Sequence, residues 1–140
     1  KTSLQKILLN DLLSAYFRRC DYETLVKITI RHEKGERTIL GTLIAGNKPR
    51  IVNIQGIPIE SDFPKNALYL RNYDKPGFIG DLGNALGSQK INIASFHLGR
   101  RDVGGEAIAL VEVDEAIDDK IVSEIKSLPQ VARVNSICFQ

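Results

Sequence analysis

The sequence contains no methionine and no tryptophan, and only two cysteines, Cys20 and Cys138. Two cysteines near opposite ends of a chain do not make a disulfide framework, so we expect two free thiols in a cytoplasmic protein, with a disulfide between them as the alternative. The two histidines and two cysteines also lack the spacing of metal ligands, which predicts no metal site.

Long apolar runs and blocks of like charge are absent as well. No stretch approaches the roughly 20 apolar residues of a membrane span, and the start of the chain lacks the pattern of a signal peptide. Charges of both signs alternate and sum to +2, so no basic stripe for nucleic acid and no acidic tail is present. With 43% hydrophobic and 26% charged residues, the sequence predicts a soluble globular protein that acts on neither membranes nor nucleic acids.

The chain begins at Lys1 and has no initiator methionine. A lysine in second position normally leaves the initiator methionine in place, so we expect the sequence to be a piece of a longer protein. Its 140 residues suffice for one domain or two small ones.

The first part of the chain, residues 1–62, is expected to be a small β-rich module with an N-terminal helix. Apolar residues recur at helical spacing over residues 3–19, which predicts the helix. Alternating apolar and polar residues predict strands, and the expected strands are residues 24–32, 37–45 and 50–55. Residues 56–64 are rich in proline and glycine and are expected to connect two modules, with the boundary near residue 62.

The second part, residues 63–140, has the pattern βαββαβ. The expected strands are residues 66–72, 91–100, 106–113 and 131–139. Pro76 is predicted to start the first helix and Gly87 to end it. Asp118 is predicted to cap the second helix, which Pro129 would terminate. The fold class is therefore α+β, with a ferredoxin-like arrangement of two helices on one face of a four-stranded antiparallel sheet.

The turn between the first strand and the first helix of this part carries the most specific functional signal. Because Gly77 has no side chain, a ligand can approach the free amides of Gly77, Phe78 and Ile79, which follow Pro76. These amides and the helix dipole favour an anion such as a carboxylate. Asp74 would either cap the helix or face an ammonium group.

Two asparagines complete the predicted pocket. Asn72 lies two residues before Asp74 and points to the same side if the chain is extended. Asn92 begins the next strand, where it either closes a turn or reaches a bound amino acid, in its own subunit or from a partner. The pattern predicts a sensor of a zwitterion rather than a catalyst.

Other polar residues give weaker signals. Lys48 and Arg50 flank a turn; they are predicted to be solvated, with an anion site for a phosphorylated metabolite as the alternative. His97 is interpreted as a sheet or interface residue, and no nucleophile–base set is organised by a motif, so we assign no catalytic residue. Three glycines fall on one helical face and are expected to pack closely against a neighbour, without forming a dinucleotide-binding fingerprint: Gly80, Gly83 and Gly87.

The second part resembles an ACT domain, a small regulatory fold that binds amino acids. The matching segments are residues 74–80, 86–87, 91–95, 104–107 and 125–131. From about residue 21 onward the chain resembles the C-terminal region of D-3-phosphoglycerate dehydrogenases, in which an allosteric-substrate-binding-like module precedes the ACT domain. The segments that carry this second resemblance are residues 41–43, 48–52, 56–57, 92–100 and 111–114.

The resemblance implies a regulatory and oligomerising fragment. Enzymes of this family oxidise 3-phosphoglycerate with NAD in the first committed step to L-serine, and serine often feeds back through paired ACT domains. Effector contacts would fall on Asn72, Asp74 and Asn92, although some relatives carry histidine or tyrosine at the position of Asn72. The resemblance implies NAD in the parent enzyme, no cofactor in this fragment and a homo-oligomer. Two alternatives are the β chain of an iron–sulfur L-serine dehydratase and a structural ACT module without ligand.

Overall fold

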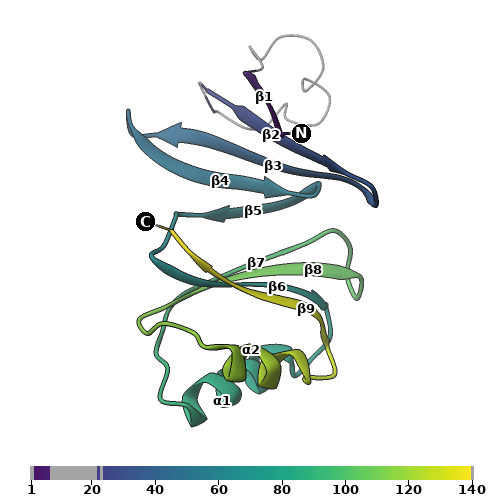
Figure 1. Cartoon of the computed structure of the whole chain (residues 1–140), viewed down its shortest axis with the longest axis vertical. Coiled ribbons are helices and arrows are strands. Elements are labelled where there is room, and N and C mark those ends of the chain that lie inside the picture. Colours follow the sequence, from purple (N-terminus) through teal and green to yellow (C-terminus); the bar gives the residue numbers. More distant parts are fainter. Residues whose placement is uncertain (1, 7–21, 23, 140) are drawn as a thin grey trace. The chain divides into compact units, whose positions relative to one another are not determined.

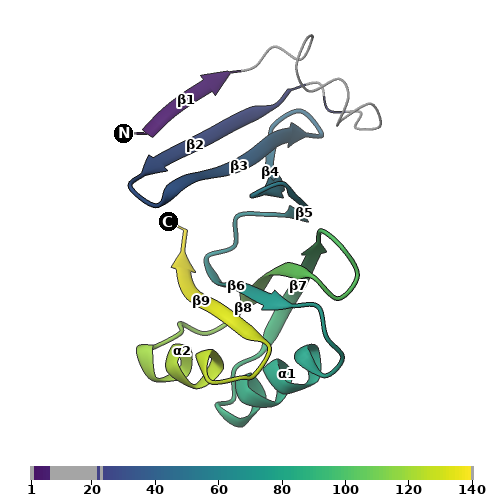
Figure 2. The same cartoon turned by 90° about the vertical axis from the view of Figure 1, so that its right-hand side faces the viewer.

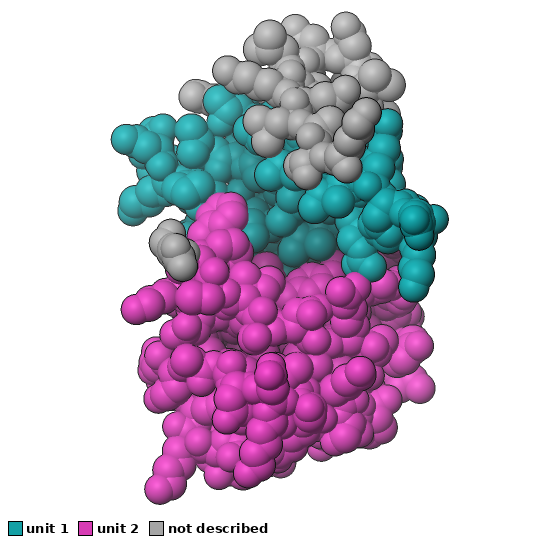
Figure 3. Space-filling view, in the orientation of Figure 1, with its two compact units in different colours: residues 1–62 teal, residues 63–140 magenta. Residues whose placement is uncertain are grey.

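The structure is a computed structural model that describes residues 2–6, 22 and 24–139. The chain divides into two compact units, residues 1–62 and residues 63–140 (Figure 3). Each unit is built on its own antiparallel sheet. The elements are β1 Thr2–Lys6, β2 Val26–His32, β3 Gly35–Ile44, β4 Lys48–Ile54, β5 Ile57–Ser61, β6 Asn66–Tyr73, α1 Phe78–Ser88, β7 Ile93–Arg100, β8 Glu106–Val113, α2 Asp119–Lys126 and β9 Val131–Cys138.

The first unit is a five-stranded meander in which each strand pairs with the next, in the order β1-β2-β3-β4-β5 (Figure 1). Tight turns with positive φ join neighbouring strands, as at Ala45 and Gly46 between β3 and β4. A small cluster of buried Leu25, Leu40 and Val52, with Tyr22 against it, packs on this sheet.

The predicted N-terminal helix is wrong at its start. Residues 3–6 belong to β1, which pairs antiparallel with β2 so that Leu4 lies opposite Ile28. Backbone pairing with a neighbouring strand can override a local helical pattern, because helix propensity is a weak preference. The rest of the predicted helix, residues 7–19, lies outside the described residues.

The connector predicted over residues 56–64 also contains a strand, β5. Gln55 and Gly56 have φ of 55° and 79°, the left-handed pair of a two-residue hairpin turn, and Ile54 pairs with Ile57 across it. Pro58 lacks an amide hydrogen but lies in β5 at one end of the strand order, where proline is tolerated. The proline and glycine content therefore marked a hairpin and not a structureless linker.

The second unit has the order β6-α1-β7-β8-α2-β9, and its strands lie in the sheet as β7-β8-β6-β9. Both helices cover one face of the sheet (Figures 1 and 2), which confirms the predicted ferredoxin-like arrangement. Between sheet and helices lies the main core, made of Leu68, Leu70, Phe78, Leu82, Leu86, Ile91, Ala109, Val111, Val113, Ile121, Ile125 and Val134.

The two helices begin and end close to the predicted residues. Helix α1 begins at Phe78, two residues after Pro76, and continues past Gly87 to Ser88. Asp118 caps α2 as predicted, because its Oδ1 accepts a hydrogen bond of 2.8 Å from the amide of Ile121.

The glycines of α1 do not pack closely against a neighbour. A Cβ atom built on Gly80, Gly83 or Gly87 would meet no described atom of a neighbouring element within 4 Å. The prediction of close packing is therefore wrong: the apolar stripe of Phe78, Leu82 and Leu86 faces the core, and the glycines lie outside it.

Candidate functional site

All the predicted effector contacts except Asn92 lie where β6 ends and α1 begins. Leu68 and Leu70 of β6 belong to the core under the helices. Because side chains alternate along a strand, the side chain of Asn72 points to the same face of the sheet as those of Leu68 and Leu70, toward the helices. Asn72 is only 2% exposed. Its Nδ2 donates to the carbonyl of Tyr73 at 3.2 Å, while its Oδ1 is buried and has no hydrogen-bond partner among the described residues.

The start of α1 has no side-chain cap. Gly77 precedes the helix with a left-handed φ of 94°, and no side chain caps the helix. The first backbone bond of the helix runs from Asp81 N to Gly77 O, at 2.8 Å. Of the three amides expected to be free, that of Phe78 donates to Lys75 O over a long 3.4 Å, so it is partly committed already.

Asp74 does not cap this helix. Its Oδ2 lies 2.8 Å from Nη1 of Arg100 and accepts a second hydrogen bond of 3.1 Å from the amide of Gly104. The hydrogen bond from Arg100, followed by that from Gly104, lowers the pKa of Asp74 below its ordinary value of 3.8. Asp74 is therefore a carboxylate at neutral pH that two donors of its own chain already hold.

Asn92 lies at the other end of the sheet from Asn72 and Asp74. Strands β6 and β7 both run antiparallel to β8, so they are parallel to each other, and the start of β7 is remote from the end of β6. There the Nδ2 of Asn92 donates to Asp114 Oδ2 at 2.6 Å, and its amide donates to Glu115 Oε2 at 2.9 Å. Within one chain, the structure does not bring the third predicted contact to the other two.

Gln130 and Asp81 belong to the same corner, although the sequence did not single them out. The amide of Tyr73 donates to Gln130 O at 2.9 Å, which brings the residue before β9 alongside the end of β6. The side chain of Gln130 reaches α1, where its Nε2 donates to Asp81 Oδ2 at 3.0 Å. Its Oε1 is buried and has no partner among the described residues. Only the register of β6 against β9 reveals this neighbourhood.

Exposed apolar side chains occur at the end of β6, in α1, in β7 and in the turn after β7. Tyr73 is 47% exposed, Ile79 57%, Leu98 40% and Val103 83%. Val103 precedes Gly104 in the turn that binds Asp74, and Leu98 lies two residues before Arg100 on β7, one of the two edge strands of the sheet. Where such exposed apolar groups form one patch, they are typical of a surface that a partner covers.

The weaker candidates lie elsewhere. Lys48 is exposed at the start of β4, and Nε of Arg50 lies 3.0 Å from Asp62 Oδ1, so the charge of Arg50 is already compensated. His97 is partly buried in β7 opposite Leu110, as expected for a sheet residue.

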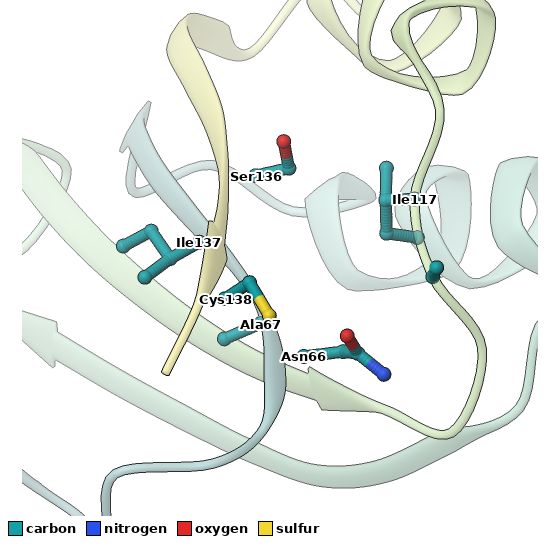
Figure 4. Close-up of a pocket in the computed structure, with 7 residues that line it drawn as sticks. Asn66, Ala67, Ile117, Ser136, Ile137 and Cys138 are labelled. Carbon is teal, nitrogen blue, oxygen red and sulfur yellow. The ribbon is translucent and has the colours of Figure 1, made fainter. Parts of the chain in front are cut away.

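A separate hollow of about 200 Å³ lies at the opposite end of the second unit's sheet from Asp74. Asn66, Ala116, Ile117, Ser136 and Cys138 are among the residues that line it, and Figure 4 shows Asn66 and Ile117 on one side of β9 and Ile137 on the other. Cys138 is a free, exposed thiol, whereas Cys20 lies outside the described residues. None of the predicted effector contacts lines this hollow.

The described part of the chain has neither a metal-binding cluster nor a membrane-crossing helix. No group of three or more His, Cys, Asp or Glu side chains there could hold a metal ion. Neither α1 nor α2 has the length and apolar character of a membrane-crossing helix.

Comparison with known proteins accounts for both units. Residues 67–130 match the ACT domain family, and residues 14–55 match the D-3-phosphoglycerate dehydrogenase intervening domain. The D-3-phosphoglycerate dehydrogenase of Bacillus subtilis is 33% identical over 116 residues, or 83% of this chain and 22% of that protein. Its counterpart from Methanocaldococcus jannaschii is 34% identical over 114 residues, or 81% of this chain and 21% of that protein.

A second kind of relative shares the same region. The probable L-serine dehydratase beta chain of Bacillus subtilis is 35% identical over 111 residues, or 79% of this chain and 50% of that protein. The chain thus spans about a fifth of the matched dehydrogenases and half of the matched beta chain. The chain thus contains an ACT domain preceded by a match to the intervening domain, and it resembles the regulatory region of D-3-phosphoglycerate dehydrogenases.

Proposed function

We propose that this chain binds L-serine, or a closely similar small amino acid, as an effector at the corner between β6 and α1. The observation that carries the proposal is a buried oxygen atom without a hydrogen-bond donor, at the corner where a helix begins without a side-chain cap. Asn72 Oδ1 is buried without a donor among the described residues, and no side chain caps α1 at Gly77. An amino acid offers the two groups that such a corner lacks, an ammonium for the carbonyl and a carboxylate for the helix amides.

A second copy of the chain would complete the site. If two β7 strands pair antiparallel about a two-fold axis, the start of each β7 lies beside the end of the other. This pairing would bring Asn92 of one copy toward Asp74 of the other, which one chain alone cannot do. It would also cover the exposed Leu98 and remove an open sheet edge. The assembly is therefore a homo-oligomer with effector sites between its ACT domains.

The parent protein in this proposal is an NAD-dependent D-3-phosphoglycerate dehydrogenase of L-serine biosynthesis that works in the cytoplasm. The chain itself performs no chemistry, and NAD belongs to the parent enzyme. An effector held by two copies would bias their relative orientation, and a coupling of about 1–3 kcal/mol would change the activity of the parent several-fold.

Thermal unfolding with and without L-serine at millimolar concentration tests the proposal. We expect serine to raise the melting temperature of the wild type, because a ligand that binds only the folded state stabilises it. Asn72→Leu removes the side-chain oxygen that lacks a donor and should abolish the shift in melting temperature. Asn84→Leu, which changes an exposed asparagine of α1, should leave the shift intact. A wild type that dimerises but shows no shift with any amino acid would leave only a role in assembly.

One observation favours a second candidate. The similarity to the L-serine dehydratase beta chain covers half of that protein at 35% identity, so the same two modules could regulate a dehydratase. The two candidates differ in what precedes the intervening domain, and sequencing of the upstream reading frame separates them. A dinucleotide-binding domain there supports the dehydrogenase, and its absence supports the beta chain.

A further inference from the structure

The side-chain amide of Gln130 has its orientation fixed by Asp81. Nε2 of Gln130 lies 3.0 Å from Asp81 Oδ2. An ionised carboxylate only accepts hydrogen bonds, so the nitrogen of the amide must face it and the oxygen must face away. Oε1 of Gln130 is therefore an acceptor, and it is buried without a donor among the described residues.

Asn72 is arranged in the same way. Its Nδ2 donates to the backbone carbonyl of Tyr73 at 3.2 Å, which is also an acceptor only, so Oδ1 faces away from it. That oxygen is the second buried acceptor of the corner without a donor among the described residues. A buried acceptor without a donor costs free energy, so a ligand that brings hydrogen-bond donors would stabilise both oxygens.

The two oxygens belong to neighbouring segments on the helix-facing side of the sheet. Asn72 pairs with Val131, and Tyr73 N donates to Gln130 O. The backbone of Gly77 adjoins the same place, because a Cβ atom on it would lie 3.5 Å from Gln130 Nε2 and 3.9 Å from Asp81 Oδ2. The side chains of Gln130 and Asp81 thus lie against Gly77, and a ligand at the start of α1 would contact both of them.

The charge of this neighbourhood suits a cation with several N–H groups. Asp81 supplies a carboxylate in the first turn of α1, and the two amide oxygens supply acceptors. Asp74 is less suited to this role, since its Oδ2 already accepts from Arg100 and Gly104.

We infer that Gln130, oriented by Asp81, recognises the ammonium group of the effector together with Asn72, and thereby selects primary amines over isosteres that lack nitrogen. This inference rests on the proposed function and assigns the amine half of that site to residues that the sequence did not indicate. Both oxygens are covered in the free chain, so binding requires a shift of the surrounding side chains.

The experiment compares two ligands on matched variants by calorimetric titration. The ligands are L-serine and 3-hydroxypropionate, which is the same molecule without its amino group. Gln130→Met keeps the length of the side chain and removes the acceptor. The control is Gln89→Met, because Gln89 also donates to a carboxylate, that of Glu124 at 3.1 Å, but lies just beyond the far end of α1.

We expect the wild type to prefer L-serine over 3-hydroxypropionate by about tenfold or more, the size of a hydrogen bond to a charged group. Gln130→Met should lose most of this preference by weakening L-serine alone, whereas Gln89→Met should keep it. Asp81→Asn lets the side-chain amide of Gln130 rotate by half a turn, because an asparagine can both donate and accept hydrogen bonds. This variant should therefore reduce the preference for L-serine to an intermediate value.

The outcomes separate the two proposals. A wild type that binds L-serine, with Gln130→Met and Asp81→Asn retaining the full preference, overturns the role of Gln130 and leaves the proposed function standing. A wild type that binds no amino acid overturns the proposed function, and the inference with it. If Gln130→Met does not fold, as judged by circular dichroism, Asp81→Asn alone decides, and an unchanged preference in that variant overturns the inference.

Discussion

The Nη1 atom of Arg100 lies 2.8 Å from Oδ2 of Asp74 and joins the end of β7 to the turn that leads into α1. The amide of Gly104 donates to the same oxygen, so the β7–β8 turn is tied to it as well. Asp74 thus fixes the relative positions of three segments around the proposed effector site, in addition to carrying a charge. The side chain of Asp74 is 19% exposed and that of Arg100 52%, which leaves the pair accessible to a ligand.

The first prediction concerns the pKa of Asp74. The hydrogen bond from Arg100 is the main cause of its depressed value, so Arg100→Ala should raise the pKa of Asp74 toward its ordinary 3.8. Arg133→Ala, which removes an exposed arginine of β9, should leave it unchanged. A carboxyl-carbon NMR titration measures the change, and an unaltered pKa in Arg100→Ala would show that the ion pair does not exist in solution.

The sign of the accompanying pH dependence follows from the depressed pKa. An acid that is stronger in the folded state stabilises the fold at pH values above its unfolded pKa. The contribution of Asp74 is therefore fully present at neutral pH, and it is lost as the pH falls below 3.8 and through the folded-state value. Acid unfolding of Arg100→Ala should show a correspondingly smaller contribution from this group.

The second prediction compares the effect of alanine substitution on stability at two glycines in and next to α1. Gly77 has φ of 94°, so Gly77→Ala forces an L residue into a left-handed conformation and should destabilise the protein by about 1–2 kcal/mol. Gly83 is helical and has open space around its Cα. Gly83→Ala should therefore stabilise the protein by about 0.5–1 kcal/mol, because alanine has the higher helix propensity. Urea denaturation of both variants measures the change in unfolding free energy. A change of the same sign in both variants would contradict the left-handed backbone conformation of Gly77.

The sequence predicted those parts of the second unit that local patterns determine. Alternation along strands and apolar spacing along helices gave the βαββαβ order, and the side chain of Asp118 marked the start of α2 because capping involves residues three apart. The corner at Asn72 and Gly77 could be located for the same reason, since the residues belong to one continuous turn.

The features that the sequence did not predict depend on pairing between distant segments of the chain. Strand β1 exists through its register with β2, and residue spacing alone gave a helix there. The contact of Gln130 with Asp81 spans 49 positions, and that of Arg100 with Asp74 spans 26. Neither pair has a local signal, because which turns meet at a corner is set by the order of strands in the sheet.

The third prediction tests the cap of α2. Asp118→Ala removes the acceptor for the amide of Ile121 and should cost about 1 kcal/mol of unfolding free energy. Asp118→Ser keeps an oxygen in place and should recover most of the loss. Thermal and urea unfolding measure both variants. Equal losses in the two would indicate that the charge of Asp118, rather than its hydrogen bond, stabilises the helix.

The fourth prediction tests the edge of the second unit as a self-association surface. Leu98 is 40% exposed on the edge strand β7, and in the proposed dimer the partner strand covers it. Leu98→Glu would bury a charge without a counterion, so the dimer dissociation constant should rise about tenfold or more.

The matched control for this surface is Leu43→Glu, because Leu43 is 47% exposed in β3 of the first unit. Sedimentation equilibrium of the wild type and both variants gives the dissociation constants. If Leu98→Glu alone weakens the dimer, the L-serine shift should weaken with it, since Asn92 would then lack the second chain that it needs to reach Asp74. A serine shift that survives in a fully monomeric Leu98→Glu protein would place the whole effector site within one copy of the chain.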